Sequence, residues 1–106
     1  MADRSKPETT AQARIVAALR QAGHVVHRLH SGKVKVRGGW MVLEPEGTPD
    51  LLLPGVAYLE TKTPTGRLSK GQTAMHVRLV RATGLPVFVV RTAAEALERA
   101  GTWRRT

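Results

Sequence analysis

Two apolar segments on either side of Pro54-Gly55 predict a tight β-hairpin in the middle of the chain. The segments are Asp50–Leu53 and Val56–Lys62, a length that suits strands better than helices. Proline followed by glycine is a typical turn signal. The shortest loop pairs Leu53 with Ala57, and this register decides which side chains share a face of the sheet.

The same register places two acidic side chains opposite each other. Asp50 falls directly across from Glu60, so their Cβ atoms are expected about 4.5–5.5 Å apart. Lys62 lies two residues beyond Glu60 and therefore points to the same face. Facing carboxylates repel unless a cation lies between them, and oxygen ligands suit Mg²⁺ or Mn²⁺. The pattern predicts a divalent-metal site beside a lysine, which would orient a water molecule or stabilise charge on a phosphate.

A purely structural interpretation of these residues is a surface hairpin with a Glu–Lys pair and an aspartate that begins a turn. A Glu-x-Lys tripeptide occurs by chance in many proteins, and Pro-Asp is common at turns. The combination favours the metal site, because charged residues inside an otherwise apolar strand need a partner.

The remaining periodicity predicts a single α/β domain over residues 1–106, with a central mixed sheet flanked by helices. Residues 1–7 and 102–106 are expected to be loose tails. The other expected elements are a helix over Glu8–Ala22, strands at His24–His30, Lys33–Arg37, Trp40–Leu43 and Pro86–Arg91, a helix from Ser69 to Gly84, and a helix from Thr92 to about Ala100.

The net charge of +9, from 17 Lys and Arg against 8 Asp and Glu, favours a polyanionic partner. The chain has only two Trp, one Tyr and one Phe, which argues against a module that stacks successive bases of a single strand. The absence of cysteine excludes disulfides and thiolate metal sites. Without a signal peptide or a membrane span, the chain is expected in the cytoplasm with no membrane partner.

The basic residues are expected to contact the phosphate backbone of a nucleic acid. Lys33, Lys35 and Arg37 share one face of a predicted strand and would form a phosphate-binding ridge. The alternative is a solvated edge strand protected by lysine. Further expected DNA contacts are Ser31, Arg67 and Lys70. His24, His27 and His30 recur every three residues, but no acidic or cysteine partner completes a zinc site nearby.

A longer pattern resembles a known nuclease family. Asp50 with Glu60-Thr61-Lys62 resembles the PD-(D/E)xK nuclease signature. The surrounding residues resemble the VRR-NUC family, the virus-type replication-repair nucleases, over about Glu8 to Glu98. The residues that carry this resemblance are Ser31-Gly32, Gly47-Thr48-Pro49-Asp50, Glu60-Thr61-Lys62, Gly66-Arg67-Leu68-Ser69 and Gln72.

The resemblance implies a restriction-endonuclease-like core and a set of site residues. Asp50 and Glu60 would be metal ligands, with the main-chain carbonyl of Thr61 as a third and Lys62 as the catalytic lysine. Family members also carry an accessory glutamine and a glutamate on the first helix. The matching positions are Gln72 and Glu8, and Glu8 would be a further metal ligand.

Both of these positions have structural interpretations too. Gln72 fits a capping box with Ser69, and its line with Met75 also turns it toward the sheet. Glu8 fits a favourable charge at a helix N-terminus.

The expected activity is hydrolysis of DNA phosphodiester bonds by a Mg²⁺- or Mn²⁺-dependent endonuclease. By resemblance, it would act on branched or four-way junction DNA in replication, recombination or repair, as a homodimer of phage or viral origin. One alternative is a non-catalytic basic DNA-binding module whose carboxylates are structural. Another is a nicking or flap nuclease without junction preference.

Overall fold

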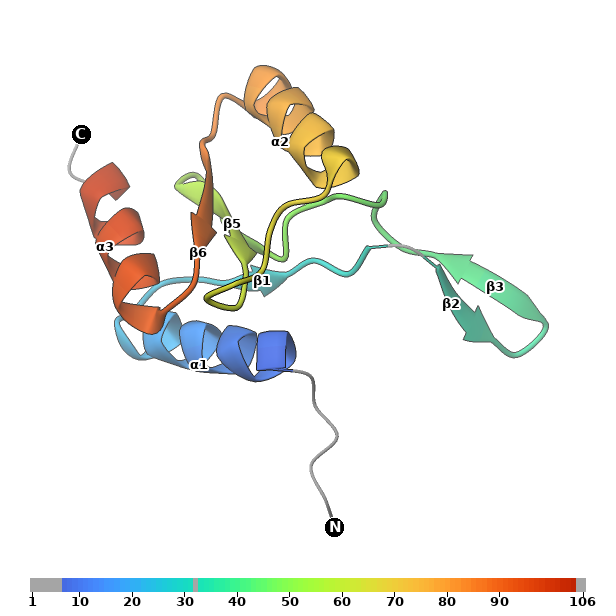
Figure 1. Ribbon diagram of the computed structural model, residues 1–106, viewed down its shortest axis with the longest axis horizontal. Coiled ribbons are helices and arrows are strands. Elements are labelled where there is room, and N and C mark those ends of the chain that lie inside the picture. Colours follow the sequence, from blue (N-terminus) through green and yellow to red (C-terminus); the bar gives the residue numbers. More distant parts are fainter. Residues whose placement is uncertain (1–6, 32, 105–106) are drawn as a thin grey trace, which may run out of the picture.

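The computed structural model describes residues 7–31 and 33–104, and within them three helices surround a four-stranded mixed sheet (Figure 1). A two-stranded hairpin extends from this body. In chain order the elements are α1 (Pro7–Gln21), β1 (His27–Arg28), β2 (Lys33–Val36), β3 (Gly39–Val42), β4 (Leu51–Leu53), β5 (Ala57–Thr61), α2 (Lys70–Thr83), β6 (Val87–Val90) and α3 (Ala93–Arg104). The predicted α/β class with a mixed central sheet is confirmed.

The main sheet has the strand order β1-β4-β5-β6, with β5 and β6 parallel and the other pairs antiparallel. The predicted hairpin is β4–β5. Leu53 pairs with Ala57 and Leu51 with Leu59, which confirms the predicted register. The tight turn is closed by Val56, whose N–H donates to the carbonyl of Leu53 at 2.9 Å.

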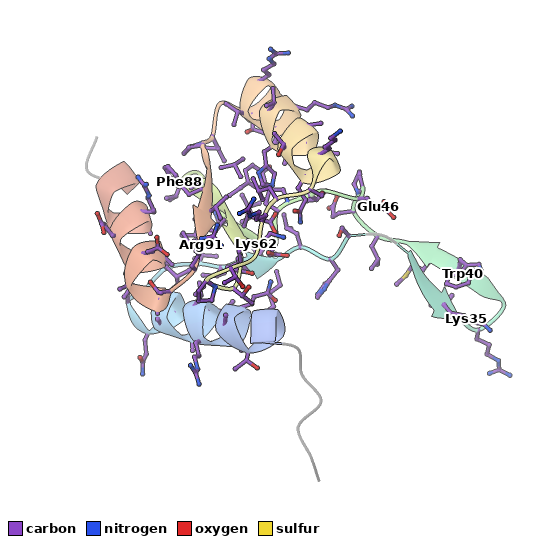
Figure 2. All side chains as sticks on the ribbon, in the orientation of Figure 1. Lys35, Trp40, Glu46, Lys62, Phe88 and Arg91 are labelled. Atoms are coloured by element: carbon purple, nitrogen blue, oxygen red, sulfur yellow. The ribbon has the colours of Figure 1, made fainter. Side chains whose placement is uncertain are left out.

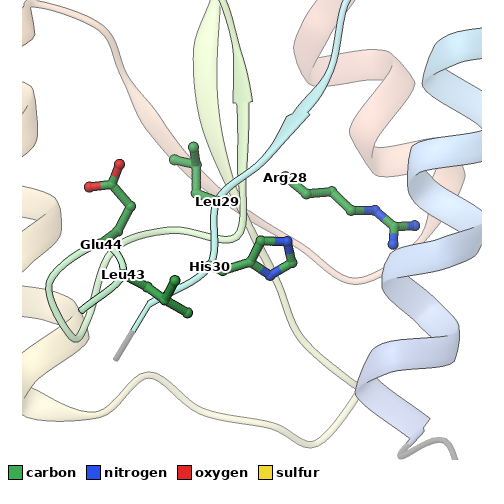
Figure 3. Close-up of a pocket in the computed structure, with 5 residues that line it drawn as sticks. All are labelled: Arg28, Leu29, His30, Leu43 and Glu44. Atoms are coloured by element: carbon green, nitrogen blue, oxygen red, sulfur yellow. The ribbon is translucent and has the colours of Figure 1, made fainter. Parts of the chain in front are cut away.

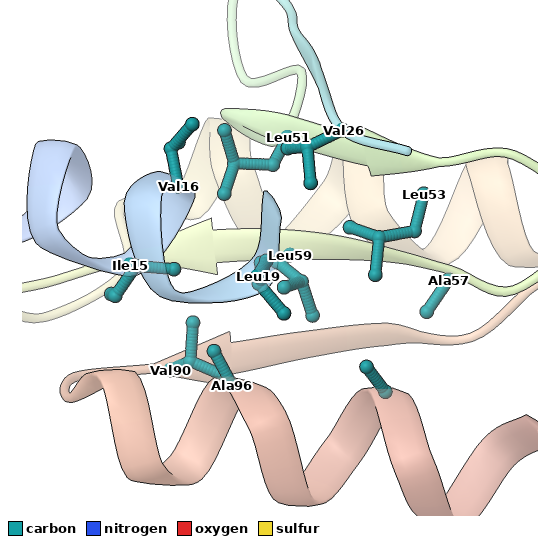
Figure 4. Packing of buried hydrophobic residues seen from close by; sticks show 11 residues of the cluster. Ile15, Val16, Leu19, Val26, Leu51, Leu53, Ala57, Leu59, Val90 and Ala96 are labelled. Atoms are coloured by element: carbon teal, nitrogen blue, oxygen red, sulfur yellow. The ribbon is translucent and has the colours of Figure 1, made fainter. Parts of the chain in front are cut away.

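The hydrophobic core lies between the sheet and the helices α1 and α3 (Figure 4). Alternate residues of β4 and β5 point into it, as the period of a strand requires. The buried core residues are Ile15, Val16, Leu19, Val26, Leu51, Leu53, Ala57, Leu59, Val90, Ala96 and Ala100. The intervening residues of β4 and β5, including Glu60, therefore point to the opposite face of the sheet.

Helix α2 covers that opposite face. Its N-cap is Ser69, which forms the predicted capping box with Gln72, and Gly84 ends it in the left-handed conformation. Leu52 and Tyr58 of the sheet, with Met75 and Leu79 of α2, line a pocket of about 260 Å³ between the two. The contact between α2 and the sheet is therefore less complete than the core on the other face.

Three features of the fold differ from the sequence prediction: the length of β1, the position of the β2–β3 hairpin and the end of α3. The strand expected over His24–His30 is only His27–Arg28, because its partner β4 has three residues. The hairpin β2–β3 forms as predicted, but it pairs with no strand of the main sheet. Helix α3 continues to Arg104, beyond its predicted end near Ala100 and into the tail that was predicted to be loose, since a glycine such as Gly101 inside a helix costs only about 1 kcal/mol. No helix among the described residues combines the length and the apolar character that a bilayer crossing requires.

Gly47 brings the loop before β4 against the start of α2. Its φ is +87°, and a Cβ atom there would lie 2.7 Å from the carbonyl oxygen of Gly71. Gly55 has a similar φ of +72° but no atom within 4 Å of an added Cβ.

We therefore expect Gly47→Ala to lower the free energy of unfolding by about 3 kcal/mol, and Gly55→Ala by about 1 kcal/mol. The difference isolates the close approach to α2, because both substitutions carry the same backbone strain. Urea denaturation of the two variants measures it, and equal losses would show that the contact with Gly71 is unimportant.

Candidate active site

Asp50 and Glu60 lie next to the last pair of the β4–β5 hairpin, Leu51 with Leu59. Asp50 directly precedes β4 and is half-buried, whereas the side chain of Glu60 is only 1% exposed. Because Leu51 pairs with Leu59, the next position along each strand brings Asp50 opposite Glu60. A nearly buried carboxylate inside an apolar strand is costly unless neighbouring groups bind it.

Asp50 is held by the residue that follows Glu60. Its Oδ2 accepts hydrogen bonds from the backbone N–H and the side-chain hydroxyl of Thr61, both at 2.8 Å. Within the described part of the chain, no hydrogen bond ends on Oδ1, which is left to bind another group. The N–H and carbonyl of a strand residue point to the same edge, so the Thr61 carbonyl also points toward Asp50.

Glu60 is bound from α2 and from its own strand. The Nε2 atom of His76 lies 3.1 Å from its Oε1, and the side-chain amide of Gln72 donates to its Oε2 at 3.4 Å. The Nζ atom of Lys62 lies 4.0 Å from the same Oε2. Glu60 is thus fixed between β5 and one face of α2.

Lys62 is buried, with 7% of its surface exposed, and its amine reaches the face that Glu60 occupies. Figure 2 shows its side chain at the centre of the body. The loop after it is held by Arg91, whose Nη1 donates to the carbonyls of Thr63 at 2.6 Å and Gly66 at 2.7 Å. A Cβ atom on Gly66 would lie 3.0 Å from the Thr63 hydroxyl, which explains the glycine in this loop.

Gln72 has both of the contacts that its sequence position predicted. Its side-chain oxygen accepts from the Ser69 N–H at 2.9 Å, and its own N–H donates to the Ser69 hydroxyl at 3.0 Å. The side-chain NH₂ group remains for Glu60. Capping therefore fixes the amide in the orientation that reaches the carboxylate.

His76 is the site residue that the sequence interpretation missed. The motifs in the sequence did not select it, yet it is buried and contacts Glu60. Burial lowers its pKa below the usual value, Asp50 raises it and Lys62 lowers it. A neutral ring with the proton on Nε2 then donates to Glu60 Oε1. The available signal was its spacing, because His76 follows Gln72 by four residues on the same helix face.

The lowered pKa of His76 predicts a pH-dependent stability in the absence of metal. Between that lowered pKa and about 6.5, the unfolded chain binds a proton that the folded chain does not, so stability rises with pH across this window. We expect His76→Gln to flatten this rise, because the variant lacks the imidazole that takes up the proton. Urea denaturation at several pH values in EDTA tests this, and parallel curves would contradict it.

Helix α1 approaches the site through Gln12, a second residue that the sequence interpretation did not select. Its side-chain amide donates to the Thr61 hydroxyl at 3.4 Å. Glu8 lies in α1 one turn before Gln12, but its side chain is outside the described residues. Its expected role as a metal ligand stays a prediction.

The predicted DNA-binding residues fall in two places. Lys35 and Arg37 are exposed on the β2–β3 hairpin, and the side chain of Lys33 is outside the described residues. Ser31, Arg67 and Lys70 are also exposed. Arg67 and Lys70 flank the N-cap of α2, close in sequence to Gln72, so the two groups of cations come from different elements.

The donor set around Asp50 and Glu60 suits a hard cation. Among the described residues, no group of three or more His, Cys, Asp or Glu side chains is arranged to hold a metal ion. Mg²⁺ needs fewer protein ligands, because it is commonly held by one or two carboxylates and keeps several waters. Asp50, Glu60 and the Thr61 carbonyl fit that pattern.

No protein-family model, curated protein or solved structure matches this chain. The candidate site therefore stands on its own residues and geometry.

Proposed function

We propose that this chain is a divalent-metal-dependent nuclease that hydrolyses DNA phosphodiester bonds at Asp50, Glu60 and Lys62. The observation that carries the proposal is the β4–β5 register, which when extended by one residue puts Asp50 opposite Glu60, together with a buried lysine 4.0 Å from Glu60. The resemblance to PD-(D/E)xK nucleases adds to it, and we propose a restriction-endonuclease-like core for the α1, α3 and sheet arrangement.

Each residue has a distinct task in this proposal. Asp50 and Glu60 would hold Mg²⁺ or Mn²⁺ with the Thr61 carbonyl, and the bound cation would lower the pKa of a water and neutralise charge on the phosphate. The Lys62 amine would donate to the attacking water or to the phosphate oxygens as negative charge increases. Gln72 and His76 would position Glu60, because both donate to its carboxylate from α2.

The direct test compares wild type with Asp50→Asn, using a matched control in Glu46→Gln, an exposed acid outside the site. End-labelled linear, flapped and four-way DNA are incubated with Mg²⁺, Mn²⁺ or EDTA. We expect wild type and Glu46→Gln to cut DNA only with metal, and Asp50→Asn to bind DNA without cutting it. Metal-dependent cleavage by Asp50→Asn would refute the site.

A non-catalytic DNA-binding module is the second candidate function. The observation that favours it is that Glu60 already has hydrogen-bonding partners in Gln72 and His76 without metal. In that case Mn²⁺ would not bind, and wild type would bind DNA without cutting it under any condition.

We also propose a homodimer, since cutting both strands of a junction in one encounter needs two active sites. Analytical ultracentrifugation with and without a four-way junction tests this. A protein that is monomeric on the junction but still cuts it would support the nicking or flap alternative.

A further inference from the structure

The hairpin β2–β3 forms an arm that stands apart from the body (Figure 1). Its two strands pair only with each other, from Lys33 opposite Val42 to Val36 opposite Gly39. The arm is joined to the sheet at its root, where the Glu44 N–H donates to the His30 carbonyl at 2.8 Å. An isolated two-stranded hairpin is marginally stable in water, so an arm of this kind is expected to gain order from a partner.

Among its described side chains, the arm exposes three large apolar ones to solvent, although burying them against a partner would be more favourable. Trp40 is 65% exposed, Met41 48% and Val36 41%. Figure 2 shows Trp40 and Lys35 on the arm, away from Lys62 in the body. Trp40 shares a face of the arm with Lys35, whereas Val36 and Met41 lie on the other face. A tryptophan exposed on a projecting element indicates a binding surface on its own face.

Charge decides what kind of partner this surface fits. Residues 33–43 contain three cations, Lys33, Lys35 and Arg37, and no acidic residue. Lys35 is paired directly with Trp40, so a cation and an aromatic ring share one face of the arm. A second copy of a chain with net charge +9 would repel this surface, whereas a polyanion would be attracted.

We propose that the arm enters a groove of duplex DNA, with Trp40 packed against sugars and base edges and with Lys35 and Arg37 on the phosphates. Each strand of the arm has four residues, about 14 Å at roughly 3.4 Å per residue, and the two strands lie about 4.8 Å apart, so the ribbon is narrow. The major groove is about 12 Å wide and 8.5 Å deep and admits a two-stranded β-ribbon. The dimensions of the arm therefore match this groove.

The root of the arm connects this surface to the candidate active site. A pocket of about 400 Å³ lies there, lined by Arg28, Leu29, His30, Leu43 and Glu44 (Figure 3). The exposed side chains of Arg28 and His30 extend to the same side of their strand, and the Leu29 N–H between them donates to the Asp50 carbonyl at 2.7 Å. A duplex held by the arm would thus reach Asp50 past the exposed side chains of Arg28 and His30.

This inference rests on the proposed function in one respect, which is that the ligand is DNA. Its test measures DNA binding and does not depend on cleavage. Binding of a labelled duplex, and of a single strand of the same sequence, is measured by fluorescence anisotropy in EDTA. The variants are Trp40→Ala and Lys35→Ala. Their matched controls are Met41→Ala on the other face of the arm and Arg81→Ala at the end of α2.

We expect Trp40→Ala to raise the Kd for the duplex about tenfold. Lys35→Ala should lower the slope of log Kd against log salt by about 1. Both controls should bind as wild type does. Variants that bind like their controls, or a wild type that prefers the single strand, would overturn the proposal.

If Trp40→Ala unfolded the arm, the loss of binding would not report on the tryptophan side chain itself. A second measurement therefore keeps Trp40 in place. In a Trp103→Phe background Trp40 is the only tryptophan, so its emission reports on the arm alone. We expect a shift or quenching on addition of duplex. No change at saturating duplex, or a shift with protein concentration alone, would overturn the DNA assignment. Cleavage by Asp50→Asn would refute the proposed function and leave these binding results standing.

Discussion

Glu60→Gln is expected to reduce metal-dependent DNA cleavage by at least about a thousandfold, because a metal ion contributes several kcal/mol to the stabilisation of transition-state charge. The substitution removes one of the two facing charges and changes the shape of the side chain little. A glutamine carbonyl can still accept from the ring of His76, which is 3.1 Å from the native carboxylate. The variant is therefore expected to fold, and removal of a nearly buried charge does not require a loss of stability.

Two measurements separate this result from a general loss of activity. Single-turnover cleavage gives the rate, and titration with Mn²⁺ gives metal affinity, which should fall together with the rate. Duplex binding in EDTA should be unchanged, since the metal site takes no part in it. Glu46→Gln, with its carboxylate exposed, is the control. A Glu60→Gln protein that cuts DNA at the wild-type rate would leave only a structural role for this residue.

The register of the β4–β5 hairpin could be predicted because it depends on local rules. A tight turn at Pro54-Gly55 fixes the register of the hairpin, and the two-residue period of a strand then fixes every face. Helix α2 was equally predictable, since Ser69 and Gln72 form a capping box and Gly84 permits the left-handed end.

The contacts of His76 and Arg91 could not be predicted in the same way. The spacing places His76 on the same helix face as Gln72, but its contact with Glu60 forms only because α2 lies across one particular face of the sheet. Arg91 follows β6 and binds the carbonyls of Thr63 and Gly66, more than twenty residues away. Both contacts depend on how elements pack, which is a long-range property of the fold.

The separation of the β2–β3 arm illustrates the same limit. Alternation of basic and apolar residues predicted the hairpin, and its pairs are confirmed. The same alternation would also suit a strand at the edge of the main sheet. The pairing of two strands within a hairpin does not determine whether the hairpin also pairs with a third strand. The detached position changes the interpretation of Lys35 and Arg37, which lie on an arm and not on a ridge of the central sheet.

Lys62→Met is expected to slow cleavage by about a hundred- to a thousandfold, the range seen when one donor to developing negative charge is removed. Methionine keeps much of the apolar length of the lysine, so the buried stem is replaced and the charge alone is lost. In contrast to Glu60→Gln, metal binding should persist. The Lys62 amine lies 4.0 Å from Glu60 Oε2, and loss of this cation leaves more negative charge for Mn²⁺ to neutralise.

Glu60→Gln is therefore expected to weaken metal binding and Lys62→Met to strengthen it, whereas both substitutions slow cleavage. The double variant Glu60→Gln/Lys62→Met should cut little more slowly than Glu60→Gln alone, because residues that act on one reacting phosphate are not additive. Mn²⁺ titration and single-turnover rates of all four proteins complete the cycle. If Lys62→Met lost metal and activity together, the lysine would act by holding Glu60 in place. If Lys62→Met cut at the wild-type rate, the lysine would have no part in the reaction.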